Sequence, residues 1–139
     1  MAAHLRRKGI APGVVLCSTA TRARETLRRV APALDPDVPV LFERGLYGAS
    51  AHSLLRRLRT VGDSASAVLL IAHSSGIEDL ALLLAGSGER LVDVRQKFPT
   101  GALATLRFDE RWRGLTAGAV ELVGFVTPRE LAAREEAAT

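Results

Sequence analysis

Residues 14–26, Val14-Val15-Leu16-Cys17-Ser18-Thr19-Ala20-Thr21-Arg22-Ala23-Arg24-Glu25-Thr26, decide the fold of this chain. The apolar residues at the start predict a short buried strand, and the residues after Thr19 predict a helix that carries arginines. A helix that begins at the carboxyl end of a parallel strand presents unpaired N–H groups and the positive end of its dipole. Arg22, in the first turn, adds a planar guanidinium that suits the same anion. The stretch therefore predicts an anion-binding site.

A second junction of this kind follows the strongest predicted strand, Val68-Leu69-Leu70-Ile71-Ala72. A continuous apolar run is typical of a parallel strand covered on both faces. It leads into His73-Ser74-Ser75-Gly76, and Ser75 with Glu78 has the spacing of a helix capping box. Because ligands of open parallel sheets bind at the carboxyl ends of the strands, Arg22 and His73 are expected at one edge, where they suit a phosphate-sized dianion.

Structural roles for these residues stay open on spacing alone. A histidine at a strand end is about as often a hydrogen-bonded structural residue as a functional one. Without further context Arg22 is better interpreted as a solvated helix residue. Glu43 follows a short predicted strand and is either an acid near the same edge or an exposed loop carboxylate. Cys17 is expected to be a small buried hydrophobe.

The rest of the chain alternates between predicted helices and strands. Helices are expected in residues 1–8, 20–34, 50–60, 75–84 and after Thr127, and strands in residues 14–17, 40–42, 68–72, 102–108 and 119–125, the last two as a hairpin. Gly86-Ser87-Gly88 is expected to close a helix, residues 91–98 are ambiguous, and His4 and His52 are expected on helix surfaces. This alternation predicts a single α/β layered domain over residues 1–139.

Composition limits the class of protein. With 47% hydrophobic and 24% charged residues the chain is globular, and its one cysteine suits a reducing compartment. It lacks the roughly 18 consecutive apolar residues of a membrane span and the features of a signal peptide, so a cytoplasmic protein without a membrane partner is expected. Aromatic residues make up only 4%, so no nucleic-acid partner is expected despite a net charge of +4. The sequence has no metal-ligand spacing, Walker loop or G-x-S-x-G motif.

The stretch from Leu16 to Thr26 resembles the second motif of the histidine phosphatase (phosphoglycerate mutase-like) superfamily, specifically that of the small bacterial SixA-type phosphohistidine phosphatases. Four further segments resemble this family in the same order: Leu46-Tyr47-Gly48-Ala49, residues 68–78 with their Ala-His-Ser-Ser-Gly core, Lys97-Phe98-Pro99-Thr100-Gly101-Ala102, and Phe125-Val126-Thr127-Pro128-Arg129-Glu130-Leu131. The resemblance covers nearly the whole chain.

The resemblance implies an α/β three-layer sandwich with a mainly parallel central sheet and helices on both faces. It matches Arg22 to a phosphate-binding arginine and His73 to the second active-site histidine, which holds the phosphoryl oxygens. The backbone at Ser74 would face the same anion, and Glu43 is the local match to the acid of the wider superfamily. No metal or organic cofactor is implied.

This sequence departs from the family's pattern at the nucleophile. The family's nucleophile is a histidine in an Arg-His-Gly-like motif on the first strand, whereas this sequence has no Arg-His pair and its His4 lies between Ala3 and Leu5. The family's first strand and its loop are therefore expected to be missing, through a start codon assigned too late, a fragment, or a degenerate relative. The expected function is hydrolysis of phosphohistidine on proteins, or of small phosphate esters. The alternatives are a non-catalytic phosphate- or phosphoprotein-binding module and, less favoured, a basic nucleic-acid-binding domain.

Overall fold

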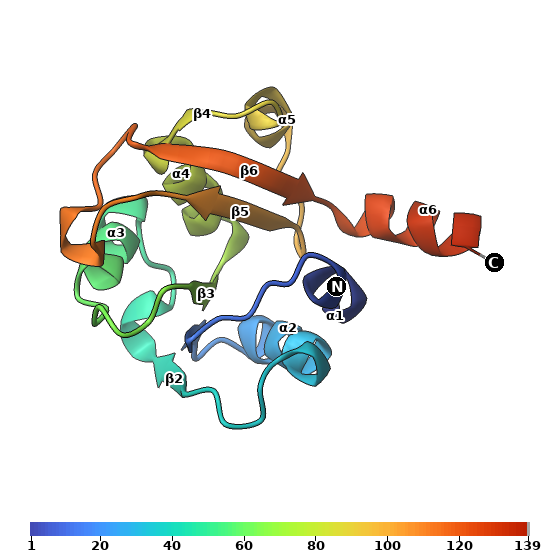
Figure 1. The fold of residues 1–139 in the computed structure, drawn as a ribbon, viewed down its shortest axis with the longest axis horizontal. Helices are drawn as coiled ribbons and strands as arrows, with labels where there is room; N and C mark the ends of the chain where they lie inside the picture. Colours follow the sequence, from blue (N-terminus) through green and yellow to red (C-terminus); the bar gives the residue numbers. More distant parts are fainter. Residues whose placement is uncertain (139) are drawn as a thin grey trace. The chain divides into compact units, whose positions relative to one another are not determined.

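The computed structural model describes residues 1–138 (Figure 1). They form two compact units, the first made of residues 1–49 and 61–73 and the second of residues 50–60 and those from 74 on. Each unit has a three-stranded sheet with helices beside it. The α/β class predicted from the alternation of periodicities is therefore confirmed.

The sheet of the first unit is parallel throughout. Its strands are β1 (Val14–Ser18), β2 (Val40–Glu43) and β3 (Val68–Ile71), in the order β2-β1-β3. The central strand β1 is almost wholly inaccessible from Val15 to Ser18, as its apolar sequence predicts. The parallel register brings the carboxyl ends of all three strands to one edge of the sheet.

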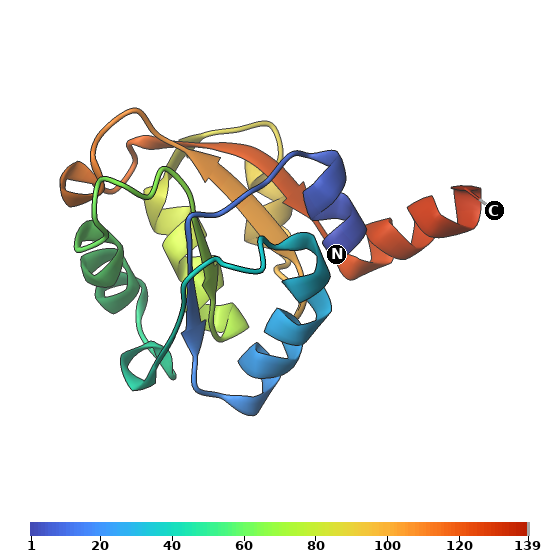
Figure 2. The same cartoon turned by 60° about the horizontal axis from the view of Figure 1, so that its bottom comes forward.

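Two helices accompany this sheet, α1 (Ala2–Arg7) and α2 (Thr21–Val30), with short 3-10 turns η1 (Ala31–Ala33) and η2 (Arg44–Leu46) (Figure 2). α1 ends because Gly9 adopts a φ of 64°, which lets the Gly9 and Ile10 N–H groups donate to the carbonyls of Arg6 and Leu5. The predicted helix over residues 20–34 is shorter than expected, since its last turn tightens into η1 at a proline.

Two expectations for this unit need correction. His4 is only 7% exposed, because α1 packs against α2 and η1, so it is not the surface residue that was predicted. β3 forms as predicted, but Val68, Leu69 and Leu70 are half-buried and not fully covered. Within residues 1–138, β3 pairs with β1 alone and forms one edge of the sheet.

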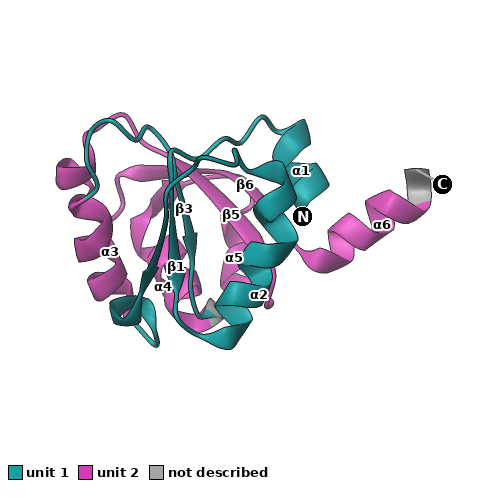
Figure 3. Ribbon diagram, turned by 90° about the horizontal axis from the view of Figure 1, so that it is seen from below, with its two compact units in different colours: residues 1–49, 61–73 teal, residues 50–60, 74–139 magenta. Residues whose placement is uncertain are grey.

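The second unit, magenta in Figure 3, contains a mixed sheet with the strand order β4-β6-β5. Its elements are α3 (Ala51–Arg59), α4 (Ser74–Leu84), β4 (Ala85–Ser87), α5 (Leu91–Gln96), β5 (Leu103–Arg107), η3 (Trp112–Gly114), β6 (Val120–Val126) and α6 (Pro128–Ala138). β5 and β6 form the predicted antiparallel hairpin. Ala81, Val94, Phe98, Leu122 and Phe125 form much of the core of this unit.

Local signals set two helix starts in this unit. Ser50 caps α3 by accepting a hydrogen bond from the Ser53 N–H at 3.2 Å, and Thr127 and Glu130 form the predicted capping box of α6. α4 ends at Leu84, just before Gly86-Ser87-Gly88 as predicted, but residues 85–87 also form the unpredicted strand β4, which pairs with β6 in parallel. Within residues 1–138 no helix is both long and apolar enough to cross a membrane.

Candidate anion-binding site

Ser18, Glu43 and His73 all lie at the carboxyl edge of the parallel sheet. Ser18, the last residue of β1, is the register partner of Glu43, the last residue of β2. Cys17 is the partner of Ile71, so His73, two residues farther on, continues β3 beyond the same edge. Neighbouring strands lie about 4.8 Å apart. The backbone therefore brings Glu43 and His73 to opposite sides of the end of β1.

The turn after β1 prepares the start of α2. The Ser18 side chain, 1% exposed, accepts a hydrogen bond from the Ala20 N–H at 3.2 Å. Ala20 is the N-cap residue, with extended backbone angles and no side-chain cap bond. Because Ala20 supplies no side-chain cap, the first N–H groups of α2 are left to bind an anion. The start of this ten-residue helix therefore has the features of an anion-binding site.

Arg22 is the second residue of α2 and is exposed. Its guanidinium makes no hydrogen bond or ion pair in the part of the chain that the structure describes. A cation at a helix N-terminus is unfavourable with respect to the helix dipole, and the first turn of α2 holds no acidic residue to offset it. Arg22 is therefore poorly explained by stability and well placed to bind an anion.

Arg24, two residues after Arg22, differs from it in making contacts with other residues. Its Nε donates a hydrogen bond to the carbonyl of Thr19 at 3.2 Å, and its guanidinium lies over the ring of Phe42, 5.1 Å from the centroid. The sequence did not predict this contact, since it depends on the pairing of β2 beside β1. In the sequence, this contact was indicated only by an arginine two residues after Arg22 and by the apolar residues of the predicted strand.

His73 is exposed and directly precedes α4. The helix begins at Ser74, so Ser75 lies inside the first turn and the start predicted from the capping box is two residues too late. The backbone of Ser74 opens a helix as the anion-binding prediction requires, while its side chain lies outside the described part of the structure. Ser74 belongs to the second unit and His73 to the first.

Glu43 is the last residue of β2 and is half-buried, so it is not an exposed loop carboxylate. Its role as an acid remains a prediction. Cys17 is fully buried, as predicted, and burial raises the pKa of its thiol while Arg24 partly lowers it. A buried neutral thiol is unsuited to nucleophilic chemistry.

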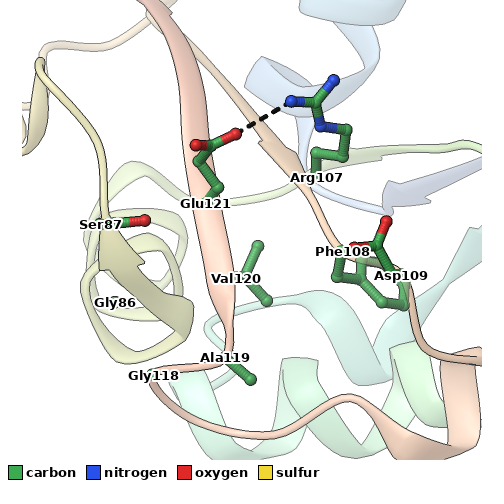
Figure 4. Close-up of a pocket in the computed structure, with 9 residues that line it drawn as sticks. All are labelled: Gly86, Ser87, Arg107, Phe108, Asp109, Gly118, Ala119, Val120 and Glu121. Atoms are coloured by element: carbon green, nitrogen blue, oxygen red, sulfur yellow. Dashed lines mark hydrogen bonds and ion pairs between the residues drawn. The ribbon is translucent and has the colours of Figure 1, made fainter.

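An open pocket in the second unit does not involve these residues. It has a volume of about 380 Å³ (Figure 4) and is lined by Gly86, Ser87, Arg107, Phe108, Asp109, Gly118, Ala119, Val120 and Glu121. Arg107 and Glu121 already neutralise each other across it at 3.1 Å. Among residues 1–138, no three His, Cys, Asp or Glu side chains gather as metal ligands.

Sequence comparison finds close relatives in mycobacteria. The chain is 36% identical over 129 residues to the uncharacterized protein Rv1276c of Mycobacterium tuberculosis, covering 90% of this chain and 79% of that protein. It is also 36% identical over 118 residues to the uncharacterized protein ML1117 of Mycobacterium leprae, covering 83% and 71% respectively. No protein-family profile matches the chain.

Solved structures share the fold. A protein from Nakamurella multipartitia that carries the name phosphohistidine phosphatase SixA superposes with a TM-score of 0.80 at 27% identity, over 91% of this chain and 77% of that one. The protein histidine phosphatase SixA complexed with tungstate gives a TM-score of 0.72 at 20% identity, over 94% and 78%. The predicted phosphoglycerate mutase-like fold is thereby confirmed.

Proposed function

We propose that this chain, which belongs to the same protein family as Rv1276c of Mycobacterium tuberculosis and ML1117 of Mycobacterium leprae, is a phosphatase that hydrolyses phosphohistidine on proteins. Its structural neighbours carry the SixA name. One observation carries the proposal. Arg22 presents an unpartnered guanidinium at the start of α2, at the sheet edge where His73 follows β3.

The proposed roles follow from the chemistry of these groups. Arg22 and the uncapped N–H groups of α2 bind the phosphoryl oxygens, and His73 donates a hydrogen bond to one of them. The N–H of Ser74, at the start of α4, contributes a further donor. Glu43 protonates the leaving nitrogen of the substrate imidazole. No metal or organic cofactor is needed for this reaction.

The nucleophile is assigned to a histidine outside this sequence. His4 is buried in α1, and the proposal already assigns His73 to the phosphoryl oxygens. In the proposed reaction, an imidazole nitrogen attacks phosphorus while the bond to the substrate nitrogen breaks and Glu43 supplies its proton. Water then attacks the phosphorylated histidine, which releases inorganic phosphate and regenerates the nucleophile. The unpaired edge of β3, within residues 1–138, supports a further strand that carries this histidine.

The experiment compares two proteins: this 139-residue chain and a version extended by the codons that precede Met1. Tungstate binding is measured by titration calorimetry, and hydrolysis is measured on a phosphohistidine-bearing protein and on a small phosphate ester. We expect both proteins to bind tungstate and only the extended one to release phosphate. If the extended protein fails on both substrates, the phosphatase proposal is wrong.

The alternative is a module that binds phosphate or a phosphoprotein without turnover. The specific observation in its favour is the absence of any Arg-His pair from the sequence. Tungstate binding by both proteins without phosphate release by either supports this alternative. Failure of both proteins to bind tungstate refutes both functions, since each requires the Arg22 site.

A further inference from the structure

We propose that Arg24 and Phe42 form a docking surface for acidic side chains that flank the phosphoryl group of a protein substrate. This rests on the proposed function and specifies that the phosphoprotein substrate carries acidic residues beside the phosphorylated histidine. The surface lies wholly in the first unit, at the same sheet edge as Arg22.

Arg24 is held in place by two contacts. Its Nε donates to the Thr19 carbonyl at 3.2 Å, and one face of its guanidinium covers the Phe42 ring at 5.1 Å. The terminal nitrogens make no hydrogen bond or ion pair within residues 1–138. Because the side chain is already ordered, a carboxylate that binds these nitrogens costs little conformational entropy.

The position of this pair fits a substrate that reaches Arg22. Arg24 is two residues after Arg22 on α2, and Phe42 directly precedes Glu43 at the end of β2. Side chains two positions apart on a helix point to different sides, so the location of Arg24 beside the site follows from its hydrogen bond to Thr19, which comes directly after the carboxyl end of β1. Residues that flank a phosphoryl group bound at this edge can therefore reach Arg24. A small phosphate ester has no such flanking groups.

The exposure of Phe42 also needs an explanation. Phe42 is 49% exposed and its neighbour Leu41 is 43% exposed, on an edge strand. Exposed aromatic side chains beside arginine are typical of the centres of protein interfaces. α2 carries four arginines and one glutamate, so the partner that complements this surface is acidic.

The test uses two peptides with the same non-hydrolysable phosphohistidine analogue, one flanked by three glutamates and one by three glutamines. Their affinities for the wild-type chain and for Arg24→Gln are measured by titration calorimetry, together with that of tungstate. We expect the wild type to prefer the acidic peptide about fivefold, which is the range of a partly exposed ion pair. Arg24→Gln should lose this preference and keep its tungstate affinity within about twofold.

Arg29→Gln is the matched control, because it removes the same charge from an exposed position at the other end of α2. It should keep the preference for the acidic peptide. Phe42 is tested as a positioning residue: Phe42→Tyr keeps the ring face and should keep the preference, whereas Phe42→Leu should lose it without losing tungstate binding.

Three results overturn the inference. The first is a wild type that binds tungstate but does not distinguish the peptides, which leaves the proposed function standing. The second is an Arg24→Gln variant that loses tungstate and peptide affinity equally, since Arg24 then belongs to the anion site. The third is a wild type that binds neither tungstate nor either peptide, which refutes the proposed function together with the inference.

Discussion

Replacement of Arg22 by alanine separates an anion-binding role from a structural one. The side chain is exposed and makes no hydrogen bond or ion pair within residues 1–138, so its removal breaks no folded-state interaction. A cation in the first turn of a helix opposes the helix dipole by about 0.3–1 kcal/mol, and alanine has the highest helix propensity. The free energy of unfolding of Arg22→Ala should therefore stay equal to that of the wild type or rise by about 0.5 kcal/mol.

Anion affinity should respond in the opposite direction. A hydrogen bond to a charged group contributes about 1.5–3 kcal/mol, and a guanidinium can donate two of them to one oxyanion. Solvent access to the exposed Arg22 reduces this contribution, so we expect a loss of about 2–3 kcal/mol, which corresponds to about 30- to 150-fold weaker binding. The N–H groups of α2 retain the residual affinity.

Titration calorimetry with tungstate and chemical denaturation, both at pH 7, measure the two quantities on the same samples. Arg29→Ala is the control, since it removes an exposed arginine from the last turn of the same helix. It should leave tungstate affinity within about twofold of the wild type and lower stability slightly, because a cation there favours the dipole. Unchanged tungstate binding by Arg22→Ala, or a loss of stability above about 1 kcal/mol, would refute the reasoning.

Three further predictions concern the scaffold. The hydrogen bonds from Arg90, followed by those of Thr127, lower the pKa of Glu130 from its ordinary value of 4.5. The stability that this shift provides is present above pH 4.5 and is lost as the pH falls through the lower folded pKa. Denaturation of Glu130→Gln measured against pH should therefore lack this loss of stability at acidic pH. Gly86→Ala should cost about 1–3 kcal/mol in urea denaturation, because its Cβ would collide with the Gly118 carbonyl, and the neighbouring Ser87→Ala is the mild control. Cys17, buried with a raised thiol pKa, should react with iodoacetamide at least about a hundredfold more slowly in the native than in the unfolded protein, and an equal rate would contradict its burial.

Much of the fold could be predicted because its signals are local. Apolar runs and three- or four-residue spacing located β1, β3, α2 and α3, and the caps at Ser50 and at Thr127 with Glu130 fixed two helix starts. β4 could not be predicted, since a three-residue strand of Ala, Gly and Ser has no periodicity and forms only by pairing with β6. The burial of His4 has the same cause: it depends on what packs on α1.

The candidate site also combines features that the local sequence predicts with features that depend on strand pairing. The positions of Arg22 in the first turn of a helix and of His73 after a strand follow from the order of residues along the chain. The partners of Glu43 and Phe42 depend on the register between β1 and β2, which no local pattern in a strand as short as residues 40–43 specifies. The contact between Arg24 and Phe42 could therefore be found only in the folded structure.

Two violations of local stability rules meet at the carboxyl edge of the parallel sheet. Arg22 is a cation at the wrong end of a helix dipole, and Phe42 is a large exposed apolar side chain on an edge strand. A sequence selected for stability alone would favour an acidic residue at the first position and a charged residue at the second. Both costs are offset if the edge binds an anion at Arg22 and a protein beside it, at Arg24 and Phe42. The same two positions therefore unite the proposed phosphatase site with the proposed docking surface.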